Sequence, residues 1–144
     1  MKIRKALITA AGDNQRALPL QRLVDRDGVP KSALQIILEE AVQAGAEEIG
    51  IVVKPGDAAT FRAAAGDLGS RLQFCTQAEP RGYGHALHCA AGFVGAEPFL
   101  HLICDHLYVS NETKRCAQQL VAVAEAENCA VSAVQATQIG RAHV

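Results

Sequence analysis

Three short polar stretches of the sequence contain residue types that are suited to binding phosphates, bases and metal ions. The first follows a short apolar run and reads Ala10-Ala11-Gly12, with Arg16 four residues further on. A glycine directly after a strand lets backbone N–H groups approach phosphate oxygens, and an arginine offers a fork of donors to the same oxygens. Asn14 can stand for a glycine of such a loop because asparagine tolerates the left-handed conformation better than most residues. These residues predict a phosphate-binding loop, and a plain turn beside a surface arginine is the alternative.

The second stretch, residues 76–87, reads TQAEPRGYGHAL. The side-chain amide of Gln77 offers a donor and an acceptor side by side, which is the pattern that pairs with the edge of a uracil or thymine. Gly82 follows five residues later and could bring a backbone N–H or C=O to the same base without a side chain in the way. A loop rich in proline and glycine that only caps a helix has the same composition, so the residues alone leave both interpretations open.

The third stretch places Asp105 directly after the apolar run 99–104. A carboxylate at the end of a strand, facing a phosphate-binding cleft, is a typical ligand of Mg²⁺. The alternative is an ordinary cap of a short turn. We expect the neighbouring His106 to pack or to support the site rather than to bind an ion.

The segments between these stretches predict a sheet that brings them together. We expect strands at residues 5–11, 48–53, 71–75, 99–104 and 130–134, and helices at 32–45, 57–65, 82–92 and 111–127. Ser32 and Gln35 form a capping box at the start of the first of these helices. Alternating strands and helices favour an α/β fold with a mainly parallel sheet and helices on both faces. Ligands gather at the carboxyl ends of such strands, so the three polar stretches are expected at one edge.

Composition narrows the class of protein. The chain has 144 residues, of which 49% are hydrophobic and 20% charged, as is typical of a soluble domain with a real core. A formal charge of −1 gives no electrostatic case for nucleic acid or an anionic membrane, and no apolar run is long enough to span a membrane. The five cysteines are scattered without a CxxC pair, which favours reduced thiols in a cytoplasmic protein over disulfides or a zinc site.

In order and spacing, the three stretches resemble the N-terminal part of the sugar-phosphate nucleotidyltransferase family, and above all its glucose-1-phosphate uridylyltransferase and thymidylyltransferase branch. The family's opening loop, A-A-G-x-G-T-R, is matched by Ala10, Ala11, Gly12 and Arg16. Its base-binding segment, Q-x-x-P-x-G-x-G-x-A, is matched by Gln77, Pro80, Gly82, Gly84 and Ala86. Asp105 falls on the family's first magnesium aspartate. The resemblance covers nearly all of residues 3–135.

This resemblance implies a Rossmann-like domain and a reaction. A sugar 1-phosphate would attack the α-phosphorus of a nucleoside triphosphate and release pyrophosphate, which requires positioning and charge neutralisation. Mg²⁺ on Asp105, with donors at Gly12 and the catalytic Arg16, would offset the charge of the phosphates. Gln77 and Gly82 would select a pyrimidine, uracil before thymine. The sequence leaves open whether the protein forms a homo-oligomer.

Departures from the family pattern leave a second function open. Asn14 and Gln15 replace the second glycine and the hydroxyl residue of the loop, and Leu20 stands where relatives have a lysine that reaches the phosphates. Arg22 or Lys31 could supply the missing catalytic cation, and the sequence does not choose between them. Loss of such a cation would cost about 3–4 kcal/mol of transition-state stabilisation. The alternative is therefore a nucleotidyltransferase-like module without catalysis, which binds a nucleotide or a partner or has a regulatory role. A dinucleotide-binding oxidoreductase is disfavoured by the lack of G-x-G-x-x-G.

The last six residues, IGRAHV, are not expected to be native. Back-translated as ATC GGA AGA GCA CAC GTC, they match a common sequencing adapter. The adapter's preceding bases complete a glutamine codon for Gln138, and its next triplet is a stop. We therefore expect residues 1–138 to form the N-terminal part of a nucleotidyltransferase domain, and residues 139–144 to carry no function.

Overall fold

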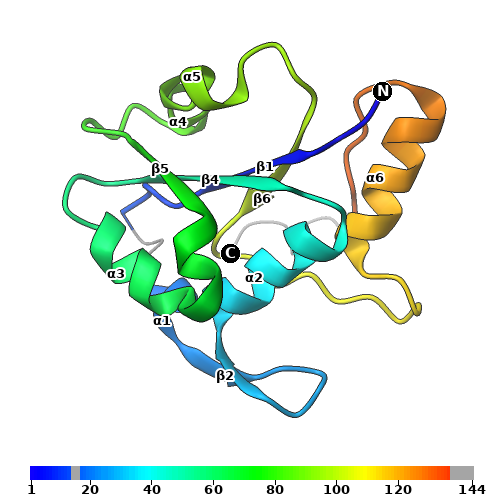
Figure 1. Cartoon of the computed structure of the whole chain (residues 1–144), viewed down its shortest axis with the longest axis horizontal. Coiled ribbons are helices and arrows are strands. Elements are labelled where there is room, and N and C mark those ends of the chain that lie inside the picture. The colour runs from blue at the N-terminus through cyan, green and yellow to red at the C-terminus, as the bar shows by residue number, and fades with distance from the viewer. Residues whose placement is uncertain (14–16, 137–144) are drawn as a thin grey trace.

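A four-stranded, fully parallel sheet forms the centre of the computed structural model, which describes residues 1–13 and 17–136 (Figure 1). Its strands are β1 (Lys5–Thr9), β4 (Glu48–Val53), β5 (Leu72–Thr76) and β6 (Phe99–Ile103), in the order β5-β4-β1-β6. Counted among themselves along the chain, these strands have the order 3-2-1-4, which is that of a Rossmann-like sheet. All five residues of β1 are buried, because a central parallel strand is covered on both faces. The predicted α/β fold is confirmed.

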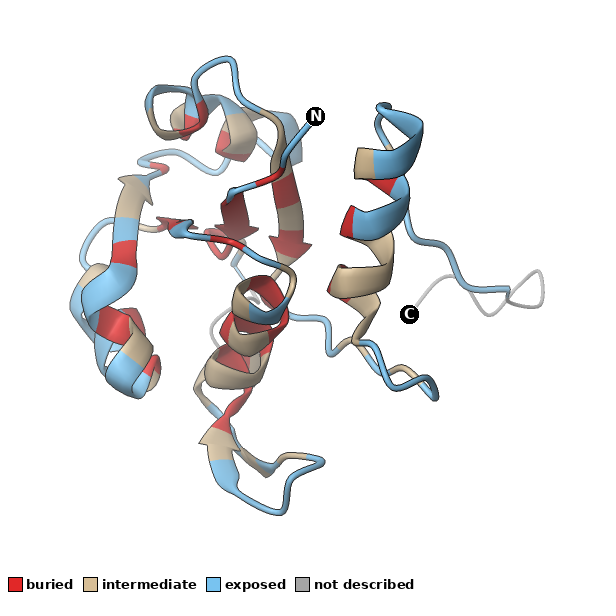
Figure 2. Ribbon diagram, turned by 45° about the vertical axis from the view of Figure 1, so that its right-hand side comes forward, coloured by how far each residue is buried: buried red, intermediate tan, exposed pale blue. Residues whose placement is uncertain are grey.

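Helices cover both faces of the sheet. On one face α2 (Ala33–Gln43), α3 (Ala58–Ala64), the 3₁₀ helix η1 (Gly66–Arg71) and α6 (Cys116–Glu127) enclose the larger core. On the other face α4 (Tyr83–Cys89) and α5 (Ala91–Val94) pack over a smaller core. Figure 2 shows the buried residues concentrated on the strands and on the helix sides that face them. No helix among the described residues combines the length and the apolar character that crossing a membrane requires.

Two features explain where α2 begins and how closely α5 approaches the sheet. The predicted capping box starts α2: the Ser32 hydroxyl accepts from the Gln35 backbone N–H at 3.0 Å, and the Gln35 side chain accepts from the Ser32 N–H at 2.8 Å. Gly50 in β4 lets α5 approach closely, since a Cβ at this position would lie 2.7 Å from the ring of Phe93. The first feature is visible in the sequence, whereas the second depends on packing between distant segments.

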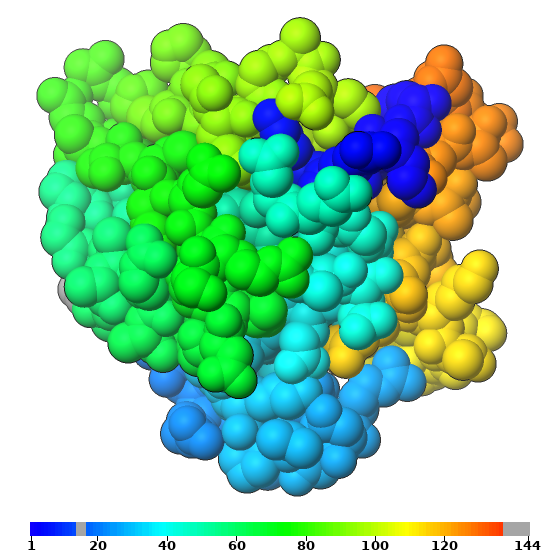
Figure 3. All heavy atoms as spheres, in the orientation of Figure 1, coloured from blue at the N-terminus to red at the C-terminus, as the bar shows by residue number. Residues whose placement is uncertain are grey.

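A β-hairpin that the sequence did not predict precedes α2. It follows the short helix α1 (Ala17–Leu20) and pairs β2 (Arg22–Val24) with β3 (Pro30–Ser32) in antiparallel register. Its strands have three residues each and no alternating apolar pattern, so no periodic signal identified them. Figures 1 and 3 show the hairpin projecting beyond α2, outside the layers of the sheet.

The C-terminal expectations were partly wrong. Residues 130–134 form no strand, and the exposed fraction of Val134 is 91%. The segment does not pair with the edge strand β6, and it instead shares the lining of a cavity of about 790 Å³ with β6 and α6. Helix α6 begins at Cys116 rather than near residue 111. Its start is set by Arg115, whose backbone N–H donates to the Gln118 side chain at 2.8 Å. Residues 137–144 lie outside the described part of the chain.

Candidate functional site

The loops that leave the parallel strands begin at one edge of the sheet. Three backbone hydrogen bonds carry the ladder one residue beyond the strands: Ala10 N to Val52 O at 2.8 Å, Gln77 N to Val53 O at 2.9 Å and Cys104 N to Thr9 O at 3.2 Å. The three polar stretches identified in the sequence therefore start from the same rim, as the rule for carboxyl ends predicts.

The order in which the chain adds strands to the sheet reverses between β1 and β6, although all four strands run in the same direction. From β1 the chain moves outward to β4 and then β5, and it returns to the other side of β1 as β6. In open α/β sheets, ligands bind outside the carboxyl ends of the strands at such a switch point. The loop after β1, which contains Gly12, and the loop after β6, which contains Asp105, flank it.

The phosphate-loop candidates begin with two alanines that belong to the protein interior. Ala10 and Ala11 are 0% and 2% exposed, and Ala11 packs in the smaller core beside Ala86 of α4. Gly12 is half-buried. The start of the loop is thus anchored in both cores, through Ala10 on one face of the sheet and Ala11 on the other. Asn14 and Arg16 lie outside the described residues, so their assigned roles stay predictions.

A lysine that the sequence analysis did not select lies beside this loop. Lys54 directly follows β4, and its Nζ donates to Oδ1 of Asp13 at 2.5 Å. This hydrogen bond and the lysine charge lower the pKa of the Asp13 carboxyl below its usual value. The rule that functional side chains follow parallel strands would have identified Lys54, because it comes immediately after the apolar run 48–53.

The two base-binding candidates contact each other. Gln77 is 5% exposed, and its Nε2 donates to the backbone oxygen of Gly82 at 3.2 Å and lies 3.0 Å from Nδ1 of His85. Gly82 has a φ of +89° just before α4, a conformation that favours glycine over residues with a Cβ. The sequence predicts that this amide offers both a donor and an acceptor to a base. In the structure its NH₂ group is instead engaged within the protein.

Polar contacts link the start of α4 to strands β6 and β1. The Tyr83 hydroxyl lies 3.0 Å from Nδ1 of His101 in β6, and Nε2 of His101 lies 3.3 Å from Oγ1 of Thr9 in β1. Burial lowers the pKa of the His101 imidazole, which favours its neutral form. The base segment therefore extends from the end of β5 across to β1 and β6, which are the strands that carry the other two candidate groups.

Asp105 lies at the exposed end of β6. Its Oδ1 is 3.6 Å from Nδ1 of His106, whose side chain is exposed, so His106 does not pack in the interior and its supporting role stays a prediction. Burial, reinforced by the charge of Asp105, raises the pKa of the neighbouring Cys104 thiol to about 12. That thiol therefore stays protonated near neutral pH. The Tyr108 hydroxyl accepts from the Ile103 backbone N–H at 2.9 Å and so holds the loop that carries Asp105.

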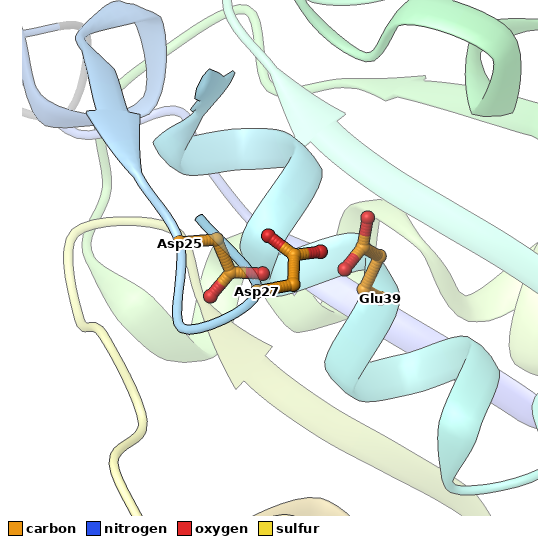
Figure 4. Close-up of side chains that lie close together, drawn as sticks. All are labelled: Asp25, Asp27 and Glu39. Carbon is orange, nitrogen blue, oxygen red and sulfur yellow. The ribbon is translucent and has the colours of Figure 1, made fainter. Parts of the chain in front are cut away.

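The candidate cations of the hairpin are already engaged there. Nζ of Lys31 lies 3.0 Å from Asp25, 2.6 Å from Asp27 and 2.9 Å from Glu39. Burial acts to lower the pKa of this ammonium, but the hydrogen bonds to the three carboxylates outweigh it and raise the pKa. Figure 4 shows these carboxylates turned toward one another between the hairpin and α2. Arg22 donates to a hairpin carbonyl at 3.3 Å. Catalytic roles for Lys31 and Arg22 stay predictions.

Comparison with known proteins identifies the family. Residues 5–140 match the family model described as "Nucleotidyl transferase". The chain belongs to the nucleotidyl transferase family. This membership confirms the resemblance seen in the sequence. The chain is 33% identical to UTP–glucose-1-phosphate uridylyltransferase of Staphylococcus epidermidis, over 93% of this chain and 55% of that protein. It is also 33% identical to the Bacillus subtilis protein of the same name, over 74% of this chain and 45% of the relative.

Two solved structures share the fold. A UDP-glucose pyrophosphorylase complexed with UDP-glucose superposes with a TM-score of 0.68 at 23% identity, covering 88% of this chain and 55% of the other. UTP-bound UGPase from Acinetobacter baumannii superposes with a TM-score of 0.67, also at 23% identity, covering 88% and 54%. The chain spans about half the length of the curated relatives and structures that it matches.

Proposed function

We propose that this nucleotidyl transferase chain provides the nucleotide-binding part of a sugar-1-phosphate uridylyltransferase. The proposed reaction joins the uridylyl group of UTP to a sugar 1-phosphate and releases pyrophosphate. The observation that carries the proposal is the arrangement of the rim. The loop with Gly12, the segment with Gln77 and the carboxylate of Asp105 all start from the carboxyl edge of one parallel sheet. The two relatives named above, both uridylyltransferases, support the choice of nucleotide.

The triphosphate would lie along the loop after β1, with Lys54 as a nearby cation. The family lysine is replaced by Leu20, which is half-buried in α1. Lys54 uses one ammonium proton for Asp13 and has two further donors for phosphate oxygens. We propose that Lys54 supplies the charge that Leu20 cannot, together with Arg16. Arg22 and Lys31 are the other candidates for this role.

Asp105 fits the requirements of a magnesium ligand. Mg²⁺ prefers oxygen donors and is typically held by one or two carboxylates together with substrate phosphates and water. Asp105 offers such a carboxylate beside the switch point, and its neighbour Cys104 stays a protonated thiol. Bound there, Mg²⁺ would neutralise charge that develops on the phosphates during the transfer.

The residues of this chain would act by positioning rather than by covalent chemistry. An oxygen of the sugar phosphate forms a bond to the α-phosphorus, and the bond from that phosphorus to the oxygen of the departing pyrophosphate breaks. Holding the base at Gln77 and the phosphates at Gly12 and Lys54 aligns the α-phosphorus for this displacement. Positive charge and backbone donors at the loop favour the departure of pyrophosphate.

Binding and turnover test the proposal separately. Calorimetric titration of the chain with UTP in the presence of Mg²⁺ is expected to give saturable binding that is weakened in Gln77→Ala, with ATP bound more weakly than UTP. Equal affinity for ATP, or no binding of UTP, would overturn it. Release of pyrophosphate from UTP is then measured over a panel of sugar 1-phosphates, with the protein extended to the length of its relatives. UTP binding without any turnover there would favour the non-catalytic module.

A further inference from the structure

The orientation of the Gln77 amide follows from the chemistry of its neighbours. A backbone carbonyl oxygen only accepts hydrogen bonds, so the amide atom 3.2 Å from the oxygen of Gly82 is the NH₂ group. The same nitrogen lies 3.0 Å from Nδ1 of His85 and has a second proton to donate. Both amide protons are therefore used within the protein. The remaining atom, Oε1, accepts no hydrogen bond from the described residues, and it is not one of the buried side-chain oxygens left there without a partner.

His85 can accept this proton in one tautomer only. Nδ1 accepts when it carries no hydrogen, which places the ring proton of the neutral imidazole on Nε2. Nε2 lies 3.8 Å from Sγ of Cys89, one turn further along α4, and sulfur is a weak acceptor for that proton. The contacts on both sides of the ring are thus consistent with one arrangement, in which His85 accepts from Gln77 and donates toward Cys89.

We propose that His85 is a positioning residue which holds the Gln77 amide with its oxygen toward the nucleotide base and thereby sets base specificity. This inference rests on the proposed function. An outward Oε1 is an acceptor, and it pairs with the N3–H donor that uracil and thymine share. Cytosine presents an unprotonated N3 acceptor at the same position, so acceptor would face acceptor. The site therefore selects UTP over CTP through a hydrogen bond that CTP cannot make.

The expected size of the selection follows from the burial of Gln77. An acceptor in a largely buried site that loses its partner, and faces a second acceptor instead, weakens binding by roughly tenfold to a hundredfold. Without the His85 acceptor the amide could rotate, because its NH₂ group would keep only one of its two partners. Either the oxygen or the NH₂ group of the amide could then meet the base, and the preference for UTP over CTP would shrink.

The ratio of the dissociation constants of CTP and UTP, measured with Mg²⁺ on the 144-residue chain, tests the role of His85. We expect a ratio of about 10 to 100 for the unchanged chain. His85→Ala should lower the ratio several-fold, chiefly by weakening UTP binding. His85→Asn should restore most of it, since the asparagine oxygen can accept near the position of Nδ1. His88→Ala is the matched control, since this exposed histidine lies on the same helix, and it should leave the ratio unchanged.

A second measurement separates positioning from general loss of structure. The ¹⁵N shifts of the His85 ring should show a protonated Nε2 and a bare Nδ1 in the nucleotide-free chain. Thermal unfolding of each variant shows whether it remains folded. UTP binding with a ratio near one, a ratio unaffected by His85→Ala in a folded variant, or a protonated Nδ1 would overturn the inference. Failure to bind either nucleotide would overturn the proposed function and this inference with it.

Discussion

The ion pair between Lys54 and Asp13 allows two substitutions to be predicted with opposite signs. Lys54→Ala removes a positive charge beside the phosphate loop and should weaken UTP binding. Asp13→Asn removes a negative charge from the same loop, releases the Lys54 ammonium, and should strengthen binding. A purely structural role of the pair would instead make both substitutions harmful, because each breaks the same contact.

The size of the Lys54 effect can be worked out from its environment. The side chain is 31% exposed, so the effective dielectric constant lies between the value near a protein surface and that of bulk water. With a value of about 40 and a separation of about 4 Å, one charge pair is worth about 2 kcal/mol before screening. Salt at physiological strength reduces this to about 1–2 kcal/mol, or about fivefold to thirtyfold in affinity. Asp13 is more exposed, so the gain in Asp13→Asn should be smaller.

Calorimetric titration with UTP and Mg²⁺ at two salt concentrations measures both effects. The matched control is Lys2→Ala, which breaks the ion pair of Lys2 with Glu125 at 3.2 Å, where the N-terminal residues lie against α6 (Figure 3). That substitution removes the same charge away from the loop and should leave the affinity unchanged. The reasoning is refuted if Lys54→Ala binds UTP as tightly as the unchanged chain, or if Asp13→Asn binds it more weakly.

Three further predictions concern the fold that supports the site. Gly50→Ala should lower the free energy of unfolding by about 1–3 kcal/mol in urea titrations, because its Cβ would lie 2.7 Å from the phenylalanine ring of α5. Gly92→Ala has open space and should be neutral or stabilising; equal destabilisation of both would contradict this account. Ser32→Ala removes the cap of α2 and should cost about 1 kcal/mol, and an unchanged melting temperature would argue against the cap. Hydrogen bonds from a lysine side chain to Asp27 and from a backbone N–H to Glu125 lower the pKa of each carboxyl in the folded chain. Their contribution to stability is therefore complete above the unfolded-state pKa values of 3.8 and 4.5 and is lost as pH falls below them, which urea titrations between pH 3 and 7 can test.

Local patterns account for the elements that the sequence predicted correctly. The continuous apolar run of β4 indicates a strand buried on both faces, and the hydroxyl and amide of Ser32 and Gln35 mark the start of α2 within four residues. The hairpin was missed because its strands are short and because some of its contacts come from distant parts of the chain. Lys31 binds Glu39 of α2, and Arg115, from the far end of the chain, binds the same carboxylate at 3.5 Å. No pattern within the hairpin itself reports these partners.

The strand predicted at residues 130–134 is the opposite case, an element that local preference indicates but that does not form. Its two valines, Val131 and Val134, favour extended structure, but a strand forms only where it pairs with another strand. In the described part of the chain this segment pairs with none, and Val134 is exposed. Propensity indicated a possible strand, but the segment does not pair with the sheet, although β6 is one of the sheet's edge strands.

By itself, the sequence determined the family, the parallel sheet and the edge at which its polar loops begin. These features depend on the types of neighbouring residues and on the rule that ligands meet the carboxyl ends of parallel strands. Only the tertiary structure decided which polar atoms remain available at that edge. The pairing of Lys54 with Asp13 joins residues 41 positions apart, and the amide of Gln77 contacts His85 on the following helix α4. The physical reason is that hydrogen bonds and ion pairs act over a few ångströms in space, whatever the separation along the chain.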